Sequence, residues 1–537
     1  MGAVGSCDVV FVTPSYLPEL SQESIGTLIL AETLKQSGFR VSIVRYWQAD
    51  APSEDYIAFK SSLLEKILEY DSRIISFYCR CAEYHINVDL ARAIKERCPR
   101  VIVVFGGPHA ELTCGPTLRA FNFIDYICRG EGENTIVPFV RHVLEKGKDV
   151  PCVVPGVAYR HDGLIRENPF PTFLPDNYKR EVNYYNLIPD EVLRHSEILG
   201  IDVGRGCPFN CIFCCTKTFW KRIFRFRDLD NIIEEIEYVV KNYGIHTFAF
   251  EHDLFTTNKE RILHFCEKLD ASNIQIKWNC SSRLDTINQQ LIDRMYESGL
   301  YALYFGIESG SERMQDIINK KLNLKRALPV IEYATRKGIE VTTSFIYGFP
   351  EETEQDIEDS LKLMFRLRTV GVKNVQIHRL SFDPGTALYN AHCHELTIPT
   401  ADPFTMNYHI AVELLDLVKT YPKVFSSFYD YPCALRETLK HIQQFNMLYS
   451  LFPNTMALIS EACLVEGVRL FDIYILFHEL CNSVLINCTK AELQFSHYAF
   501  LFESFINNFV LDDERGAFSK QTKINVNRVF HLECQWV

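Results

Sequence analysis

The chain has 537 residues and a formal net charge of −12 at pH 7, with 47% hydrophobic and 23% charged residues. This negative charge argues against a nucleic acid partner, because phosphate binding depends on clustered Lys and Arg. No run of about 18 uncharged apolar residues occurs, which argues against a membrane partner. Without a secretory signal or a disulfide framework, the 19 cysteines indicate reduced thiols and a metal site in a cytoplasmic protein.

Short apolar runs alternate with helical patterns over residues 1–150, which predicts a parallel, doubly wound, Rossmann-like sheet. The expected strands are 9–12, 40–45, 74–78, 101–105 and 124–127, and the expected helices are 26–36, 56–70 and 87–97. Two strand ends, where such sheets bind ligands, are glycine-rich, although neither matches G-x-G-x-x-G. From the residues alone, a ligand site and ligand-free tight turns are both open.

A linker of residues 151–196, rich in Pro, Asn and Tyr, is expected to contain β elements and to wrap the domain junction. Residues 197–390 then repeat a strand with a helix, which predicts a partial (β/α)6 barrel with its chemistry at the carboxyl ends of the strands. The expected strands are 198–203, 247–251, 274–279, 302–307, 340–347 and 374–380, and the expected helices are 228–243, 259–269, 289–298, 324–337 and 353–368.

The first barrel strand leads into a loop with three cysteines at C-x3-C-x2-C spacing. They are Cys207, Cys211 and Cys214, and the aromatic residue Phe213 stands directly before the third. Three thiolates on one tight loop can hold three corners of a cubane iron–sulfur cluster, which leaves the fourth iron without a protein ligand, whereas electron-transfer clusters use four cysteines. Cys215 points in a different direction from Cys214, so we expect it to be structural.

This spacing resembles the signature of the radical S-adenosylmethionine (SAM) enzymes. The resemblance implies a 4Fe-4S cluster whose open iron binds the methionine part of SAM. It also implies that one electron cleaves SAM to a 5′-deoxyadenosyl radical, so an external electron donor of the flavodoxin or ferredoxin type is expected as a partner. The cofactors then supply the chemistry, and the protein positions and shields them.

Four other strand ends carry residues that we expect to bind SAM. Asp253 lies in a segment that resembles the acidic segment contacting the SAM amino group in cobalamin-type members, although His252 replaces its first acid; a capped loop start is the alternative. Arg283 can pair with the SAM carboxylate or form a surface ion pair. Glu308, within Gly-Ile-Glu-Ser-Gly-Ser, resembles the ribose-binding glutamate, and Ser344 precedes a Gly-Phe-Pro-Glu-Glu-Thr turn that resembles the one beside the adenine.

The first domain, with its Gly-Gly-Pro-His and Gly-Glu-Gly-Glu turns directly before such a core, resembles the cobalamin-binding domain of cobalamin-dependent radical SAM enzymes. The resemblance implies that cobalamin binds at the strand ends, and the candidate residues are Pro14, Ser15, Gly106, Gly107, Gly130 and Glu131. An Asp-x-His-x-x-Gly motif is absent, and no histidine follows the first strand, so we expect cobalamin to bind without a histidine ligand.

Residues 391–537 lose the β/α alternation, which predicts a mainly helical domain, and a helical cap over the barrel mouth would exclude water from a radical. The resemblance favours a cobalamin-dependent C-methyltransferase acting on a peptide natural product, a secondary metabolite or a lipid precursor. A non-methylating isomerase, cyclase or oxidative enzyme is the main alternative. A tRNA methylthiotransferase would carry another cysteine trio and a basic tail, and a cluster-bearing sensor would not cleave SAM. The sequence identifies neither the substrate nor a catalytic side chain.

Overall fold

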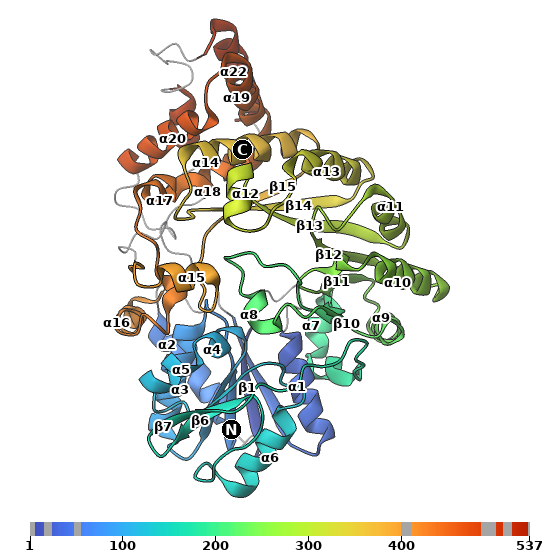
Figure 1. Ribbon diagram of the computed structural model, residues 1–537, viewed down its shortest axis with the longest axis vertical. Helices are drawn as coiled ribbons and strands as arrows, with labels where there is room; N and C mark the ends of the chain where they lie inside the picture. Colours follow the sequence, from blue (N-terminus) through green and yellow to red (C-terminus); the bar gives the residue numbers. More distant parts are fainter. Residues whose placement is uncertain are drawn as a thin grey trace.

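The computed structural model describes residues 6–15, 24–47, 55–398, 410–484, 501–507 and 518–534. Two α/β units and a helical C-terminal region follow one another along the long axis of the molecule (Figure 1). The first unit lies at one end, the second crosses the middle, and most C-terminal helices lie at the other end. This is the predicted α/β class and order of parts.

The first sheet has seven strands in the order β2-β1-β3-β4-β5-β6-β7. The strands are β1 (Val9–Ser15), β2 (Val41–Trp47), β3 (Ile74–Tyr78), β4 (Ile102–Gly106), β5 (Tyr126–Cys128), β6 (Val157–His161) and β7 (Leu164–Glu167). Strands β1 to β5 are parallel, and β6 and β7 from the linker extend the sheet in antiparallel fashion. The strand order reverses between β1 and β3, which is where doubly wound sheets bind ligands.

Helices cover both faces of this sheet. They are α1 (Ile25–Gln36), α2 (Tyr56–Leu68), α3 (Tyr84–Arg97), α4 (Pro108–Leu112), α5 (Cys114–Ala120) and α6 (Ile136–Lys146). Successive side chains of β1 enter opposite apolar clusters, because strand side chains alternate between faces. Val9 and Phe11 join one cluster, and Val10 and Val12 join the other. The continuous apolar run in β1 therefore reflects burial on both sides.

The second sheet has six parallel strands in the order β15-β14-β13-β12-β11-β8. The strands are β8 (Leu199–Asp202), β11 (Thr247–Glu251), β12 (Lys277–Ser282), β13 (Leu300–Glu308), β14 (Glu340–Tyr347) and β15 (Asn374–Arg379). Strands β8 and β15 form the two edges and do not pair with each other, so the barrel is open, as predicted. A separate antiparallel pair, β9 (Gly204–Arg205) and β10 (Arg225–Phe226), flanks the cysteine loop.

The second unit has eight described helices. They are α7 (Asp190–His195), α8 (Thr216–Trp220), α9 (Leu229–Tyr243), α10 (Lys259–Ala271), α11 (Gln289–Glu297), α12 (Glu312–Ile317), α13 (Ala327–Arg336) and α14 (Glu354–Thr369). Of these, α8 and α12 lie beside the cysteine loop, and the others contribute to the apolar core of the sheet. Asp228 caps α9 by accepting from the Asn231 amide, as its position predicts. Trp278 is fully buried, stacks on Phe250 at 4.9 Å and donates to the Ser298 carbonyl at 2.9 Å.

The described C-terminal region is helical, as predicted, but it divides between the two units. Its helices are α15 (Ala387–His392), α16 (Leu415–Thr420), α17 (Ala434–Thr438), α18 (Ile442–Leu451), α19 (Pro453–Glu466), α20 (Leu470–Val484) and α22 (Lys520–Glu533). Val418 and Phe425 join the core of the first unit, whereas Phe445 and Leu448 join the core of the second. The segment therefore packs on the first unit before it returns to the second.

Helices α18 and α20 cover the edge of the barrel at β15 and α14, and the predicted cap over the mouth stays a prediction. Asn446 Nδ2 donates to the Val375 carbonyl at 2.8 Å, and the Phe471 amide donates to Glu358 at 2.7 Å. Without this cover, β15 would present unpaired backbone groups at an exposed edge. Within the described ranges, no single helix could cross a membrane by length and hydropathy, although the bent pair Ala434–Leu451 and Pro453–Glu466 could do so together.

Buried ion pairs join the two α/β units. Arg205 of β9 pairs with Glu131 at 2.9 Å and with Glu133 at 2.6 Å, and Arg225 of β10 pairs with Glu131 at 2.8 Å. The side chains of Glu131 and Arg225 are 1% and 3% exposed. Both acids lie just beyond β5 of the first sheet, and both arginines flank the cysteine loop of the second unit. We call these four residues the interdomain ion network.

The network extends into the barrel at Asp202, the last residue of β8. Asp202 pairs with Arg180 at 2.7 Å and with Arg205 at 3.2 Å. Burial alone would raise the pKa of Asp202, but Arg180, Arg205 and Arg227 outweigh this effect and hold the pKa at about 2. The carboxylate is therefore ionised at neutral pH and completes a chain of alternating charges from β5 to β8.

Replacing Glu131 should weaken the attachment of the first unit. Glu131→Gln leaves Arg225 buried without a counter-charge, so we expect the free energy of unfolding to fall by about 3 kcal/mol. Glu167→Gln removes an acid that is 44% exposed and pairs with Arg129, so it should cost less than about 1 kcal/mol. Urea unfolding followed by circular dichroism measures both variants. Equal losses would show that the interdomain ion network has no special part in stability.

Candidate functional site

The three cysteines of the predicted cluster loop lie between β9 and α8 as free, half-buried thiols. Burial raises the pKa of Cys207 to about 11, and the charges of Cys214 and Cys211 add to the increase, so the three sulfurs are neighbours. Among the described residues, no three His, Cys, Asp or Glu side chains are placed to hold a single metal ion. A cubane cluster places a separate iron on each thiol. Three thiols on one short loop are the donor set that such a cluster needs, and the cluster ligands stay a prediction.

Asp253 fixes the start of the loop. The amide of Gly206, directly before Cys207, donates to Asp253 Oδ2 at 2.7 Å. Gly206 has a φ of +94°, and a Cβ at this position would lie 1.9 Å from the carbonyl oxygen of Ile223. Burial raises the pKa of Asp253. The residue predicted to contact SAM thus also holds the backbone that presents the first thiol.

The middle of the loop is fixed by the turn that follows α12. The Ile212 amide donates to the Ile318 carbonyl at 3.1 Å, and Asn319 Nδ2 donates to the Asn210 carbonyl at 2.8 Å. These bonds connect the cysteine loop to the strand end that carries Glu308. The cluster loop and the predicted ribose site therefore form one structural unit.

Glu308 ends β13 with a strained backbone. Its φ is +69°, which is uncommon for a residue other than glycine, and the pairing of β13 with β14 shifts register between Gly306 and Glu308. The side chain is 11% exposed and pairs with Lys320 Nζ at 2.8 Å. One carboxylate oxygen is thus held by Lys320, and the other is left to accept a hydrogen bond, which fits the predicted contact with ribose hydroxyls.

Arg283 lies directly beside the cysteine loop. Its guanidinium stacks on the Phe209 ring at 3.8 Å and makes two hydrogen bonds, of 2.8 and 2.9 Å, to Asp285. Its Nη1 lies 4.0 Å from Cys211 Sγ. Asp285 occupies the bidentate face of the guanidinium and the Lys320 carbonyl accepts from Nη2, so Nη1 is the nitrogen that is directed at the Cys211 thiol.

Ser344 and Phe213 complete the predicted SAM residues. Ser344 is buried on β14 and interacts with the hydroxyl of Tyr304 from β13. Phe213 contacts Phe349 of the Gly-Phe-Pro turn edge-on, with 5.9 Å between ring centroids. The structure therefore brings the candidates of the cysteine loop and of the ends of β11 to β14 to one end of the open barrel.

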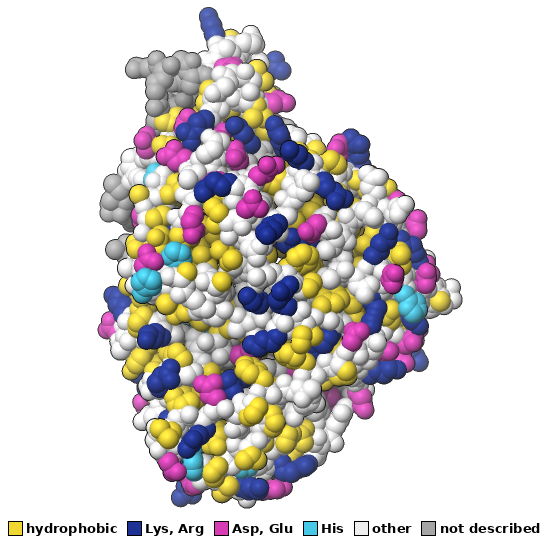
Figure 2. Space-filling model, viewed as in Figure 1, with side chains coloured by type: hydrophobic (Ala, Val, Ile, Leu, Met, Phe, Trp, Pro, Cys, Tyr) yellow, Lys and Arg dark blue, Asp and Glu magenta, His cyan; other side chains and the backbone are white. Residues whose placement is uncertain are grey.

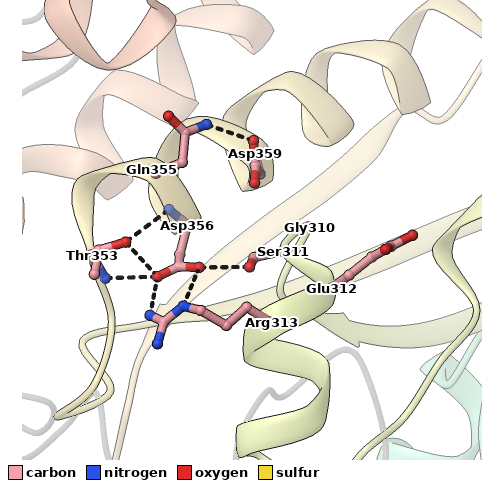
Figure 3. A pocket seen from close by; sticks show the side chains of 8 residues that line it. All are labelled: Gly310, Ser311, Glu312, Arg313, Thr353, Gln355, Asp356 and Asp359. Atoms are coloured by element: carbon pink, nitrogen blue, oxygen red, sulfur yellow. Dashed lines mark hydrogen bonds and ion pairs between the residues drawn. The ribbon is translucent and has the colours of Figure 1, made fainter.

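The turns after β13 and β14 are bonded together beside Glu308 (Figure 3). Asp356 accepts from the Ser311 hydroxyl at 2.6 Å and from the Thr353 amide at 2.8 Å, and it pairs with Arg313. Burial would raise the pKa of Asp356, but these hydrogen bonds lower it to about 2. A Cβ at Gly310 would lie 2.5 Å from the carbonyl oxygen of Asp359. The ribose turn is therefore held rigidly against α14.

The predicted cobalamin residues lie at the carboxyl ends of β1, β4 and β5. Gly107 has a φ of +95°, and a Cβ there would lie 2.9 Å from the Cys79 carbonyl oxygen. Gly130 has a φ of +74°, and a Cβ there would lie 2.9 Å from Pro171. Packing against the protein itself thus accounts for both glycines, and a contact with cobalamin stays a prediction for them. For Pro14, Ser15 and Gly106, too, a contact with cobalamin stays a prediction. Residues 16–23, which follow Ser15, lie outside the described chain.

Glu131 has partners other than the predicted cofactor. Its carboxylate receives the two arginines of the interdomain ion network and the Leu174 amide at 2.6 Å. His109 of the Gly-Gly-Pro-His turn is also engaged, since its Nε2 lies 2.8 Å from the Val424 carbonyl and burial lowers its pKa. Both side chains are thus engaged within the protein, and a contact between Glu131 and cobalamin stays a prediction.

Two residues of the site are absent from the sequence-based predictions. Lys320 follows a short helix, and no periodic or motif signal links it to Glu308. Arg205 stands between two glycines directly before the cysteines, so its position could have drawn attention, but its partner Glu131 is 74 residues earlier. Lys320 stands 12 residues after Glu308, so this contact depends on the turn that follows α12, whereas the Arg205 contact depends on how the two units pack.

Two family models match the chain, one over each α/β unit. The model of the radical SAM superfamily matches residues 201–364, and the model of the B12 binding domain matches residues 19–140. The chain belongs to the cobalamin-dependent radical SAM enzymes. Its cofactors are therefore a 4Fe-4S cluster, SAM and cobalamin, and the cysteine loop described above is the part of the radical SAM domain that fits the cluster.

Several known proteins are similar to the chain. The uncharacterized methyltransferase PH0819 of Pyrococcus horikoshii is 29% identical over 385 residues, which are 70% of this chain and 82% of that protein. An anaerobic magnesium-protoporphyrin IX monomethyl ester cyclase of Cereibacter sphaeroides is 26% identical over 376 residues, which are 66% of this chain and 59% of the cyclase. The structure of OxsB, a cobalamin-dependent SAM radical enzyme with aqua-cobalamin and SAM bound, shares the fold, with a TM-score of 0.61 and 13% identity over 99% of this chain and 84% of OxsB.

A methyl group at Gly206 should prevent cluster assembly. In Gly206→Ala the new Cβ would collide with the Ile223 carbonyl, so the loop must move away from Asp253. We expect less than about a tenth of the wild-type iron after anaerobic reconstitution, since a contact this short cannot relax without a backbone shift. Gly147→Ala is the matched control, because Gly147 also has a positive φ of +76° but nothing within 4 Å. Normal iron content in Gly206→Ala would contradict the proposed loop geometry.

We expect three of the four cysteines in this segment to bind the cluster and the fourth to be dispensable. Cys207→Ala, Cys211→Ala and Cys214→Ala should each lose the visible absorbance of the cluster and the formation of 5′-deoxyadenosine. Cys215→Ala should keep both, because Asp383 and Cys81 lie near this thiol and burial raises its pKa. Iron analysis and absorbance spectroscopy of the four purified variants measure the outcome. Loss of the cluster in Cys215→Ala would overturn the ligand assignment.

Proposed function

We propose that this protein is a C-methyltransferase that uses the radical SAM reaction and cobalamin to methylate a peptide natural product, a secondary metabolite or a lipid precursor. The proposal places the reaction in the cytoplasm, with no part for nucleic acid or membrane, and with an external flavodoxin-type or ferredoxin-type electron donor. The supporting relative is PH0819, whose name describes a methyltransferase.

A single geometric observation carries the proposal. The carboxyl edge of the first sheet faces the cysteine loop of the second unit, because Glu131 and Glu133 beyond β5 pair directly with Arg205, two residues before Cys207. A methyl carrier on the first edge and a radical generator on the second would therefore face one another across a substrate. Methyl transfer requires such a juxtaposition, since the reacting carbon must reach both groups.

When bound, the cluster and SAM supply the radical that activates a carbon, and cobalamin supplies the methyl group. The protein holds these groups through its own charges. Burial raises the pKa of Cys211, while Lys320 and Arg283 oppose this effect and favour the thiolate that binds iron. Lys320 also orients the Glu308 carboxylate for the ribose hydroxyls of SAM. Asp253 and the turn after α12 keep the loop in place.

The inner wall of the barrel indicates a polar substrate. Val375 and Ile377 of β15 face the outer apolar core, so the alternating residues Gln376 and His378 face inward. Gln376 and His378 bond to each other at 3.1 Å, and Tyr304 of β13 is 38% exposed. Amide, imidazole and phenol groups recognise hydroxyl, amide or carboxylate groups by hydrogen bonds. We propose that the substrate presents such a group to β13 and β15.

A second candidate is a non-methylating oxidative enzyme or cyclase on the same scaffold. It is favoured by the similarity to the Cereibacter sphaeroides cyclase. The chain spans 59% of that protein, so the cyclase reaction is the weaker proposal. The two candidates differ in their SAM products, since methyl transfer forms S-adenosylhomocysteine in addition to 5′-deoxyadenosine.

One assay separates these functions. The chain is reconstituted anaerobically with iron and sulfide, supplied with SAM, cobalamin and dithionite, and both SAM products are quantified by mass spectrometry. We expect 5′-deoxyadenosine from the wild type and at least about tenfold less from Glu308→Gln, which loses the charge paired with Lys320. Glu312→Gln is the control, because this acid begins α12 four residues further on and lies apart from the hydrogen-bonded group around Asp356 (Figure 3).

The products of the wild type decide between the candidates. Formation of S-adenosylhomocysteine together with 5′-deoxyadenosine supports methyl transfer. 5′-Deoxyadenosine without S-adenosylhomocysteine, at saturating cobalamin and with candidate substrates present, would favour the non-methylating enzyme. No 5′-deoxyadenosine from a fully reduced cluster would refute radical chemistry altogether.

A further inference from the structure

A group of exposed basic side chains lies directly after the cysteine loop. Lys217 on α8, and Lys221 and Arg222 in the turn that follows, are all exposed. Lys and Arg side chains gather over α8 near the middle of the face shown in Figure 2. We call these three residues the basic patch. Its position is notable because the whole chain carries a net charge of −12.

The basic patch is bonded to the backbone of the cysteine loop. Arg222 Nε donates to the carbonyl oxygen of Pro208 at 2.9 Å, and Pro208 directly follows Cys207. Lys217 lies three residues after Cys214. The carbonyl of Ile223 packs so closely on Gly206 that no side chain fits there. The basic patch is thus bonded directly to the loop that carries the predicted cluster ligands.

The backbone of the basic patch is held in an unusual conformation. Lys221 and Arg222 have successive φ values of +50° and +63°, in the left-handed region that residues other than glycine seldom adopt. The Ile223 amide donates to the Trp220 carbonyl at 2.8 Å, and Lys221 Nζ donates to the Thr218 carbonyl at 2.6 Å. Strain of this kind persists only where surrounding contacts impose it, and it clusters at functional surfaces.

No acid within the described part of the chain neutralises the basic patch by an ion pair. The carboxylate that Lys221 influences is Glu111, which accepts from the Gly130 amide at 2.7 Å and is half-buried. Lys221 and Arg222 donate to backbone carbonyl oxygens, which carry no net charge, so the three exposed positive charges are not cancelled by these bonds. Charges grouped in this way steer an oppositely charged protein and raise its rate of association.

Apolar side chains lie among these charges. Ile223 is 43% exposed and Phe170 is 41% exposed, and Lys221 Nζ lies 5.0 Å from the Phe170 ring. A small surface with apolar groups inside a charged rim is typical of transient complexes, and electron-transfer pairs bury less than about 1,200 Å². The isoalloxazine ring of a flavin carrier has an apolar dimethylbenzene edge, which can pack on Ile223 and Phe170. The polar loop around the cluster of a ferredoxin would match these two side chains less well.

We propose that the basic patch is the docking surface for a small acidic electron carrier of the flavodoxin type, a proposal that rests on the proposed function. In this complex one electron passes from the reduced flavin to the cluster held by Cys207, Cys211 and Cys214. The flavin is oxidised by one electron, the cluster is reduced by one electron, and no atom is transferred. The acidic rim of the carrier meets Lys217, Lys221 and Arg222, and its flavin edge meets Ile223 and Phe170.

The test compares two charge reversals with the same change in net charge. Lys217→Glu/Lys221→Glu alters the basic patch and leaves the bond from Arg222 to Pro208 intact. Lys35→Glu/Lys66→Glu alters exposed lysines on α1 and α2 of the first unit. Binding of oxidised flavodoxin to each reconstituted protein is measured by surface plasmon resonance at low and high salt, and cluster reduction by flavodoxin hydroquinone is followed by anaerobic stopped-flow absorbance.

We expect the patch variant to bind flavodoxin at least about tenfold more weakly and to lose most of the salt dependence, because exposed charge pairs act through screened attraction. Its cluster should be reduced correspondingly slowly by flavodoxin, whereas dithionite should still give wild-type 5′-deoxyadenosine. The control variant should match the wild type in all three measurements. Binding of flavodoxin that does not depend on salt, or an equal loss of binding in the two variants, would contradict the assignment of the docking surface.

Two further outcomes have distinct meanings. If an acidic ferredoxin reduces the cluster through the basic patch while flavodoxin does not bind, the assignment of a flavin carrier is wrong. If dithionite gives no 5′-deoxyadenosine from the wild type, the proposed function fails, yet the binding measurement still tests the docking surface. A failure of one proposal is therefore not mistaken for a failure of the other.

Discussion

The pairing of two acids beyond one sheet with two arginines beside another is the contact on which this protein depends. Glu131 and Glu133 end the first unit, and Arg205 and Arg225 flank the cysteine loop of the second. Charges buried at such a junction are costly unless each is matched, so the two units are held in one relative position. That position sets the predicted methyl carrier opposite the predicted radical source.

The cysteine loop is defined by neighbours on every side, which explains how a short irregular segment can present three thiols reproducibly. Its start is held by Asp253, its middle by Asn319, and its preceding strand by the first unit. The backbone strain at Glu308 lies next to this arrangement. Rigid surroundings of this kind are needed where a reactive species must attack one carbon and spare the rest.

The sequence predicts the regular elements well because their signals are local. The strands Thr247–Glu251 and Glu340–Tyr347 have the expected bounds, and the cysteine spacing marks the loop without help from the fold. The pairs Lys320–Glu308 and Arg205–Glu131, which are 12 and 74 residues apart, could not be predicted, since neither spacing belongs to a helical or strand pattern. The division of the C-terminal helices also escaped prediction, because an apolar helix face does not reveal which core will accept it.

The return of the C-terminal segment to the first unit has a mechanical consequence. The chain passes between the units once in the linker, a second time before Val418 and a third time before Phe445. Three connections between the same two units resist their separation more than one linker would, because opening them also requires the C-terminal segment to leave one of the two cores.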